Sequence, residues 1–169
     1  KKKYKPLTIK GDINKYKHLN MIKNVRINNF ELNIYNRFAE NLSKKELTIN
    51  YKNDILNLLR QIIRYSKKYY RTNDYILDFI ENFSDPNEIH KEMEFFTFEE
   101  YQKFDRVIDD FNYHVLFEVL YYLGLRQGEC QALTWSDINF DKNIVNIRKT
   151  LTTKIKGEKY TISSPKTKS

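Results

Sequence analysis

The stretch that most constrains this chain is residues 120–137, LYYLGLRQGECQALTWSD, where an apolar run stops at a glycine and new helical material follows at once. A glycine just past the last periodic residue is a common helix stop, so we expect a helix to end at Gly124. Arg126 and Glu129 then lie three residues apart on one face of a second helix, whose apolar side continues to Trp135. The corner therefore holds a guanidinium beside a carboxylate, which fits either a surface ion pair or an arginine that binds phosphate.

Length and composition exclude several classes of protein. The 169 residues suffice for one ordinary domain or two small ones. No run approaches the apolar length of a membrane span, and the lysine-rich start lacks the apolar core of a signal peptide, so we expect a cytoplasmic location. The single cysteine, Cys130, excludes an internal disulfide and a multi-cysteine metal site. Because the chain lacks an initiator Met, we expect it to be a piece of a longer protein.

The charge is divided into blocks. Residues 1–82 hold 18 lysines and arginines against 8 carboxylates, residues 83–118 hold 3 against 10, and residues 119–169 hold 9 against 4. The net charges are therefore +10, −7 and +5. A basic block of this density attracts a polyanion, and nucleic acid is the usual one. A membrane surface is the rival partner, but no exposed Trp/Phe stripe opposes the lysines.

The first half of the sequence predicts a helical bundle. Apolar residues at helical spacing predict helices over 8–21, from Asn28 to Leu42, over 47–70 and, more briefly, over 74–83. The first of these helices carries Ile9, Ile13 and Tyr16 on its apolar face. The helix over 47–70 is the longest and should supply most of the core.

Cations follow one edge of this long helix without alternating acidic residues. Such a row is either a solvated face or a phosphate-binding edge, and the start of the helix is the better candidate for entering a groove of DNA. The residues concerned are Lys44, Lys45, Asn50 and Lys52 at the start, and Arg60, Arg64, Lys67 and Lys68 further along.

The turn-forming residues 84–87 and the acidic residues after them predict a linker over 85–96. Thr97 and Glu100 have the spacing of a capping box, so a helix should run from Phe98 to about Asp110. The next helix, over 113–123, is almost wholly apolar, which is typical of a central core helix.

After Trp135 the period changes to that of strands. We expect a hairpin with strands over 137–141 and 144–153, then a turn over 156–158 and a third strand over 160–164. Residues 165–168 would form a loop at the edge of this three-stranded sheet.

Cysteine or metal chemistry is not expected. Cys130 has no histidine at helical spacing and fits a small buried side chain. His18, His90 and His114 are expected on three separate elements with no carboxylate or cysteine at ligand spacing, so a metal site is not predicted.

The ordered set of features resembles the tyrosine recombinases, specifically the integrases of phages and conjugative transposons. The set comprises a basic helical bundle, an acidic linker, the segment GLRQGECQALTWSDINF, a small sheet and the loop PKTKS. The resemblance is strongest over 117–140 and 165–169. It implies a helical core-binding domain at 1–84 that clamps DNA, a linker at 85–96 and the first part of an α+β catalytic domain at 97–169.

The resemblance also implies roles for particular residues. Arg126 takes the place of the first catalytic arginine, which grips the scissile phosphate, and Glu129 matches the acidic position that holds the active-site cations. Lys166, with Lys168 as the alternative, matches the lysine that protonates the departing 5′ oxygen. The nucleophilic tyrosine and the second arginine belong downstream.

We therefore expect a mainly α fold with a small antiparallel sheet, from a site-specific recombinase that cuts duplex DNA at attachment sites through a 3′-phosphotyrosine. Neither metal nor nucleotide is needed for that chemistry, and the complete enzyme would assemble as a tetrameric synaptic complex in a bacterial nucleoid. These residues alone should bind DNA without cutting it. The alternatives are a non-catalytic DNA-binding module with the same fold and a helical protein-interaction domain with an incidental basic face.

Overall fold

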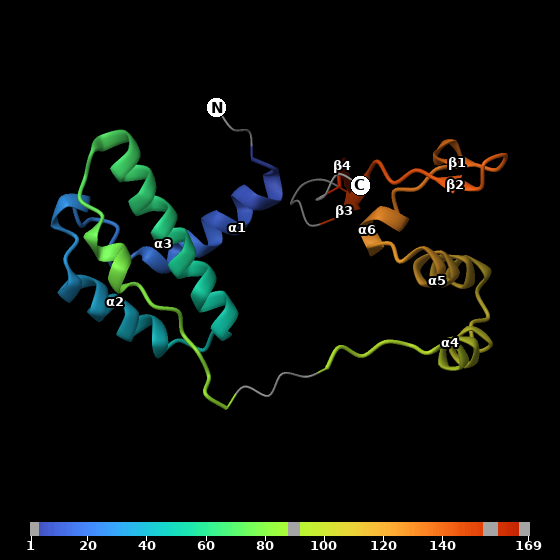
Figure 1. Ribbon diagram of the computed structural model, residues 1–169, viewed down its shortest axis with the longest axis horizontal. Helices are drawn as coiled ribbons and strands as arrows, with labels where there is room; N and C mark the ends of the chain where they lie inside the picture. Colours follow the sequence, from blue (N-terminus) through green and yellow to red (C-terminus); the bar gives the residue numbers. More distant parts are fainter. Residues whose placement is uncertain (1–3, 88–91, 154–158, 166–169) are drawn as a thin grey trace. The chain divides into compact units, whose positions relative to one another are not determined.

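The computed structural model describes residues 4–87, 92–153 and 159–165. The chain divides into two compact units, Lys1–His90 and Lys91–Ser169 (Figure 1). Helices dominate, and the described strands form two small antiparallel sheets. The predicted fold class, mainly α with a small antiparallel β component, is confirmed.

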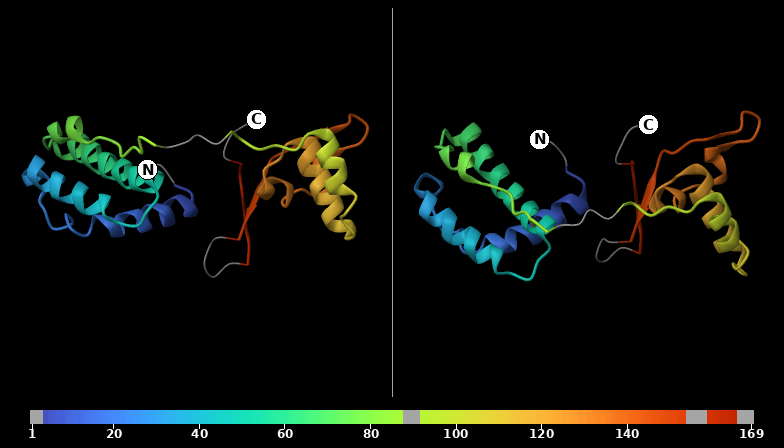
Figure 2. Two further views of the ribbon diagram at one scale, coloured as in Figure 1. Left: turned by 90° about the horizontal axis from the view of Figure 1, so that it is seen from below. Right: turned by 60° about the horizontal axis from the view of Figure 1, so that its bottom comes forward.

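The first unit is a helical bundle. Its helices are α1 (Pro6–Tyr16), α2 (Leu32–Ser43) and α3 (Ile49–Tyr70), with short 3₁₀ turns at Lys17–Leu19, Ile27–Asn29 and Tyr75–Phe79. Figure 2 shows α3 running alongside the rest of this bundle. The core is continuous from α2 through α3 to the Tyr75–Phe79 turn, and its most deeply buried side chains are Phe38, Leu42, Ile55, Leu56 and Ile63.

Local sequence explains the bounds of α3. Thr48 caps its start, because the Thr48 hydroxyl accepts a hydrogen bond from the backbone N–H of Tyr51. Arg71 ends it in the left-handed conformation at φ 56°. The 22-residue rod thus presents an apolar stripe to the bundle and a polar stripe to solvent.

The apolar face predicted for the first helix is not buried. Helix α1 begins at Pro6, whose fixed φ suits a first helical position. It contains no buried residue, and Ile9, Ile13 and Tyr16 are all exposed. The chain enters the core only at Leu19 and Ile22, after α1 has ended. Although α1 contacts α3, these three side chains remain about half exposed.

The second unit combines three helices with two hairpins. Its elements are α4 (Phe98–Asp105), α5 (Phe111–Leu123), α6 (Gln127–Cys130), a 3₁₀ turn at Trp135–Asp137, and strands β1 (Ile138–Asn139), β2 (Ile144–Val145), β3 (Thr150–Thr152) and β4 (Thr161–Ser163). The predicted capping box is present, with reciprocal hydrogen bonds between Thr97 and Glu100. Helix α4 is shorter than predicted, because it ends at Asp105 and a turn follows at 106–107. The side chain of Asp110 then caps the start of α5.

The prediction of a central core helix was wrong for this structure. Helix α5 contains no buried residue, and Phe111, Tyr113 and Tyr122 are exposed. Aromatic contacts with α4 cover one side of α5, through Tyr101 on Tyr121 and Phe104 on Phe117. Helix α5 also contacts α6, and Leu116, Val119 and Leu120 are partly buried.

Two further predictions need correction. The helix after Gly124 spans four residues and ends at Cys130, and Trp135 is 80% exposed instead of continuing its apolar face. The expected three-stranded sheet is two separate two-stranded sheets, β1 with β2 and β3 with β4. The long predicted strand over 144–153 is interrupted at 146–149, which splits it between the two. The expected turn over 156–158 lies outside the described residues.

Candidate nucleic-acid interface

Arg126 is held at both its backbone and its side chain by one carboxylate. The preceding helix α5 stops at Gly124, which adopts φ 59°, and Arg126 then begins α6. Glu129 Oε2 accepts a hydrogen bond from the Arg126 backbone N–H at 3.1 Å, and Glu129 Oε1 accepts one from Arg126 Nη1 at 3.0 Å. Glu129 is 6% exposed, whereas the Arg126 side chain is 62% exposed. The buried acid therefore orients a guanidinium that still faces solvent.

The same hydrogen bonds determine the ionisation of Glu129. The backbone N–H of Arg126, and then its guanidinium, lower the pKa of Glu129 against the opposing effect of burial. The carboxylate is consequently ionised at neutral pH. Arginine offers five N–H donors in a planar fork, and Glu129 uses one, so the others remain available to a phosphate.

Gly128 brings α6 into close contact with β3. A Cβ atom on Gly128 would lie 2.6 Å from the carbonyl oxygen of Leu151 and 2.7 Å from Oγ1 of Thr150. The first of these is a backbone atom and cannot move aside independently of the strand. Glycine at this position therefore places Arg126 next to the second hairpin.

A polar cluster anchors the segment after α6. Asp137 Oδ2 accepts hydrogen bonds from the Thr134 backbone N–H at 3.0 Å and the Thr134 hydroxyl at 2.7 Å, and it forms an ion pair with Lys149 Nζ at 2.8 Å. These contacts, led by that of Lys149, lower the pKa of Asp137 from 3.8 to about 2. The Thr134–Asp137 half has the three-residue spacing of a capping box, whereas Lys149 is distant in sequence and was not predicted.

The predicted row of cations on α3 divides into two sets, and the first holds the segment 74–83 along the helix. Lys67 forms an ion pair with Asp74 at 2.8 Å, Arg60 Nη2 donates to the Ile80 carbonyl at 2.7 Å, and Lys52 lies over the Phe83 ring. These three side chains thus have structural partners. The same segment is held by Asn53, which exchanges two hydrogen bonds with the Phe83 backbone.

The second set faces solvent. Arg64 and Lys68 are exposed, and within the described ranges neither forms an ion pair. Lys68 lies 5.5 Å from the centre of the exposed Tyr69 ring. At the other end of α3, Asn50 is exposed and Lys45 is partly exposed, whereas Lys44 pairs with Glu40 at 2.6 Å.

The predicted catalytic lysine, Lys166, and its alternative, Lys168, lie outside the described residues. The chain reaches them from β4, which pairs with β3, and β3 contacts α6. Cys130 is half-buried, and burial raises the pKa of its thiol, which opposes nucleophilic chemistry.

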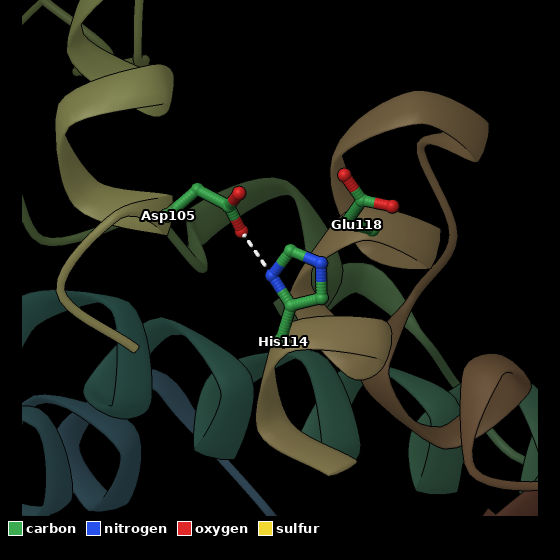
Figure 3. A group of neighbouring side chains, drawn as sticks. All are labelled: Asp105, His114 and Glu118. Carbon is green, nitrogen blue, oxygen red and sulfur yellow. Dashed lines mark ion pairs between the residues drawn. The ribbon is translucent and has the colours of Figure 1, made fainter. Parts of the chain in front are cut away.

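The sequence interpretation of the histidines missed one cluster. His114 Nδ1 lies 2.8 Å from Asp105 Oδ1, and Glu118 lies one helical turn beyond His114 (Figure 3). The statement that no carboxylate stands at ligand spacing was wrong for His114. The signal was present, because positions 114 and 118 share a helix face at i and i+4.

The fold of this chain is similar to that of a solved transposon integrase. The Tn1549 transposon integrase, solved in complex with transposon right end DNA, matches 97% of this chain with a TM-score of 0.70 at 20% identity. A second structure of that integrase, in complex with a circular intermediate DNA, matches 96% of the chain with a TM-score of 0.64 at 18% identity.

The second unit also resembles integrases in sequence. Residues 94–164, which include Arg126 and Glu129, match the phage integrase family. Prophage integrase IntR of Escherichia coli (strain K12) is 49% identical over 37 residues, which make up 22% of this chain and 9% of that protein. The resemblance to phage and transposon integrases is thus confirmed.

The match covers part of each relative. The chain spans 53% of the length of each Tn1549 integrase chain. Among the described residues, no helix combines the length and the apolar character that crossing a bilayer requires.

Proposed function

We propose that this chain is the DNA-clamping and phosphate-gripping part of a site-specific recombinase of the tyrosine type. The observation that carries the proposal is the geometry of Arg126, which a buried glutamate orients while the guanidinium stays open to solvent. The segment around it matches the phage integrase family, and the proteins to which the chain is similar are integrases by name. A surface ion pair alone does not require that one partner be buried and bonded to the other's backbone.

In this proposal Arg126 binds the scissile phosphate. Charge develops on the phosphoryl oxygens during strand exchange, and a guanidinium fixed before the reaction stabilises that charge without reorganising. Glu129 acts through Arg126, because it touches the arginine and not the substrate. Lys166, or Lys168, protonates the departing 5′ oxygen.

The complete reaction requires groups beyond these. A tyrosine hydroxyl attacks the phosphorus and forms a 3′-phosphotyrosine while the 5′ oxygen leaves as a hydroxyl, so the bond energy is conserved. We propose that this tyrosine lies outside the 169 residues, that the residues described here bind DNA without cutting it, and that the complete enzyme works as a tetramer on attachment sites.

For duplex DNA we propose contacts mainly from polar side chains of the first unit that are exposed or partly exposed. These are the cations Arg64, Lys68 and Lys45 and the amide Asn50. Lys52, Arg60 and Lys67 already hold the segment 74–83, so their contribution to phosphate binding is smaller. The domain assignment in this proposal is a clamp at 1–84, a linker at 85–96 and a catalytic portion at 97–169.

Fluorescence anisotropy with a labelled duplex of about 30 base pairs tests the DNA part of the proposal. Several phosphate contacts make the affinity fall by roughly tenfold or more between 50 and 200 mM salt. The double variant Arg64→Ala/Lys68→Ala should weaken binding and flatten that salt dependence. A matched control, Arg106→Ala/Lys103→Ala, removes the same two charge types from exposed positions in the acidic region and should change little. Binding that is absent, or insensitive to salt, would refute the proposal.

A further inference from the structure

Three side chains with metal-binding atoms meet at the corner between α4 and α5. Asp105 is the last residue of α4, and His114 and Glu118 lie on successive turns of α5. One ligand atom from each residue lies within 4.8 Å of the ligand atoms of the other two. Figure 3 shows the imidazole between the two carboxylates. The loop 106–110 therefore returns the chain so that both helices contribute to one small cluster.

The contact between Asp105 and His114 is short but is not a hydrogen bond. Asp105 Oδ1 lies 2.8 Å from His114 Nδ1, yet this buried oxygen accepts no hydrogen bond from any described residue. An imidazolium that simply paired with the carboxylate would point its N–H at the oxygen. Asp105 Oδ1 is therefore a buried oxygen whose capacity to accept a hydrogen bond or bind a cation is unused by the described residues.

A second buried polar atom borders the cluster. Tyr101 lies one turn before Asp105 on α4, is 4% exposed, and its hydroxyl has no hydrogen-bond partner among the described residues. Burial raises the pKa of Tyr101, and the negative charges of Asp105 and Glu118 raise it further. An unpartnered buried hydroxyl is costly unless another group, such as a carboxylate or a water bound to a metal, accepts a hydrogen bond from it.

The local charge also lacks compensation. Asp105 and Glu118 contribute two carboxylates, and across residues 4–87, 92–153 and 159–165 no lysine or arginine forms an ion pair with either. A neutral imidazole with two carboxylates carries a charge of about −2, which one divalent cation neutralises. One nitrogen and two oxygen ligands suit zinc and similar transition metals better than Mg²⁺, which prefers an octahedron of oxygen atoms.

We propose that Asp105, His114 and Glu118 bind one divalent transition-metal ion of the zinc type, which clasps the end of α4 to the first turns of α5. Ligands about 2.1 Å from a tetrahedral zinc lie roughly 3.4 Å from one another. Asp105 Oδ1 and His114 Nδ1 are closer than this, at 2.8 Å, so these two atoms must separate slightly while the other ligand separations, all within 4.8 Å, adjust to the metal. His114 and Asp105 have side chains 36% and 22% exposed, so the ion can enter from solvent. The site is structural and does not depend on the proposed recombinase function.

Calorimetric titration of the metal-free 169-residue chain with Zn²⁺ tests this inference. We expect uptake of one ion per chain and a rise in the melting temperature on its addition. His114→Gln and Glu118→Gln should each weaken Zn²⁺ binding by more than about tenfold, since even the loss of a supporting residue costs 10–100-fold. His18→Gln is the matched control, because it removes a histidine from the first unit, and Cys130→Ser removes the thiol.

Both controls should bind Zn²⁺ as the unmodified chain does. Circular dichroism of each variant without metal establishes that its helices persist, and Asp105→Asn provides a second test if one variant unfolds. The inference is overturned if the unmodified chain takes up no zinc, or if His114→Gln binds as tightly as His18→Gln. Competition by Mg²⁺ at the concentration of Zn²⁺ would also overturn it, because it would exclude a site of the zinc type.

Discussion

Glu129 binds Arg126 at two points, through the backbone N–H at 3.1 Å and through Nη1 at 3.0 Å. The two bonds use both oxygens of a buried carboxylate, so neither residue can rotate without leaving a buried acceptor unpaired. The two hydrogen bonds therefore fix the orientation of the Arg126 guanidinium.

Replacement of Arg126 should lower strand cleavage much more than it lowers the affinity for duplex DNA. In the complete recombinase, Arg126→Ala should lower strand cleavage by about 10²–10³-fold, as the loss of a transition-state donor does elsewhere. Duplex affinity should fall far less, since the proposed role gives Arg126 one phosphate contact among many. Trapping the covalent protein–DNA complex on a nicked duplex measures cleavage. Arg126→Lys keeps the charge but loses the fork and should fall in between.

The control for this experiment is Arg148→Ala, which removes an exposed arginine from the same basic region. Its cleavage should stay close to that of the unmodified enzyme. Normal strand transfer by Arg126→Ala would contradict the role of Arg126.

The close approach of α6 to β3 predicts that alanine destabilises the fold at Gly128 but not at Gly11, where a Cβ has free space. Gly128→Ala should lower the free energy of unfolding by about 1–3 kcal/mol, because the new Cβ meets the backbone oxygen of Leu151. Gly11→Ala, in α1, meets nothing within 4 Å and should raise it by about 0.5–1 kcal/mol. Urea unfolding measures both. Equal effects at the two positions would contradict the packing of α6 on β3.

The segment 74–83 depends on α3 through Asn53. Asn53→Ala leaves the backbone N–H and carbonyl of Phe83 without their partner, which should cost about 1–3 kcal/mol of folding free energy. Gln61→Ala, at an exposed position of the same helix, should change the stability by less than about 0.5 kcal/mol. Denaturant unfolding followed by circular dichroism distinguishes them, and a neutral Asn53→Ala would show that other contacts hold the segment.

Asp137 predicts a loss of stability in acid. Its pKa is lowered from 3.8 to about 2 by Lys149 and Thr134, so it binds its proton more weakly in the folded state than in the unfolded state. The stabilisation is therefore complete above about pH 4 and is lost as the pH falls toward 2. Asp137→Asn should melt at a lower temperature than the unmodified chain at pH 7, and the two should converge near pH 2.

Asp141→Asn is the control for the acid experiment, because Asp141 is exposed. It should follow the unmodified chain at every pH. A constant difference in melting temperature between Asp137→Asn and the unmodified chain across this range would contradict the lowered pKa of Asp137.

Sequence alone predicted the features that depend on neighbours within one or two helical turns. The stop at Gly124, the Thr97–Glu100 capping box and the pairing of Arg126 with Glu129 all join residues three or four positions apart or depend on one residue's conformation. Short-range spacing is the information that helical periodicity carries. The core stripe of α3 was predicted in the same way.

Tertiary structure decided which of these side chains have partners distant in sequence. It assigned Arg60 to the backbone of Ile80, brought Lys149 to Asp137 and set Gly128 against Leu151. It also left the apolar face of α5 largely uncovered and brought Asp105 to His114. Spacing specifies the face of an element on which a side chain lies. The residues that pack against that face come from distant segments of the chain. Their position depends on how the intervening loops close, and a local sequence pattern does not carry this information.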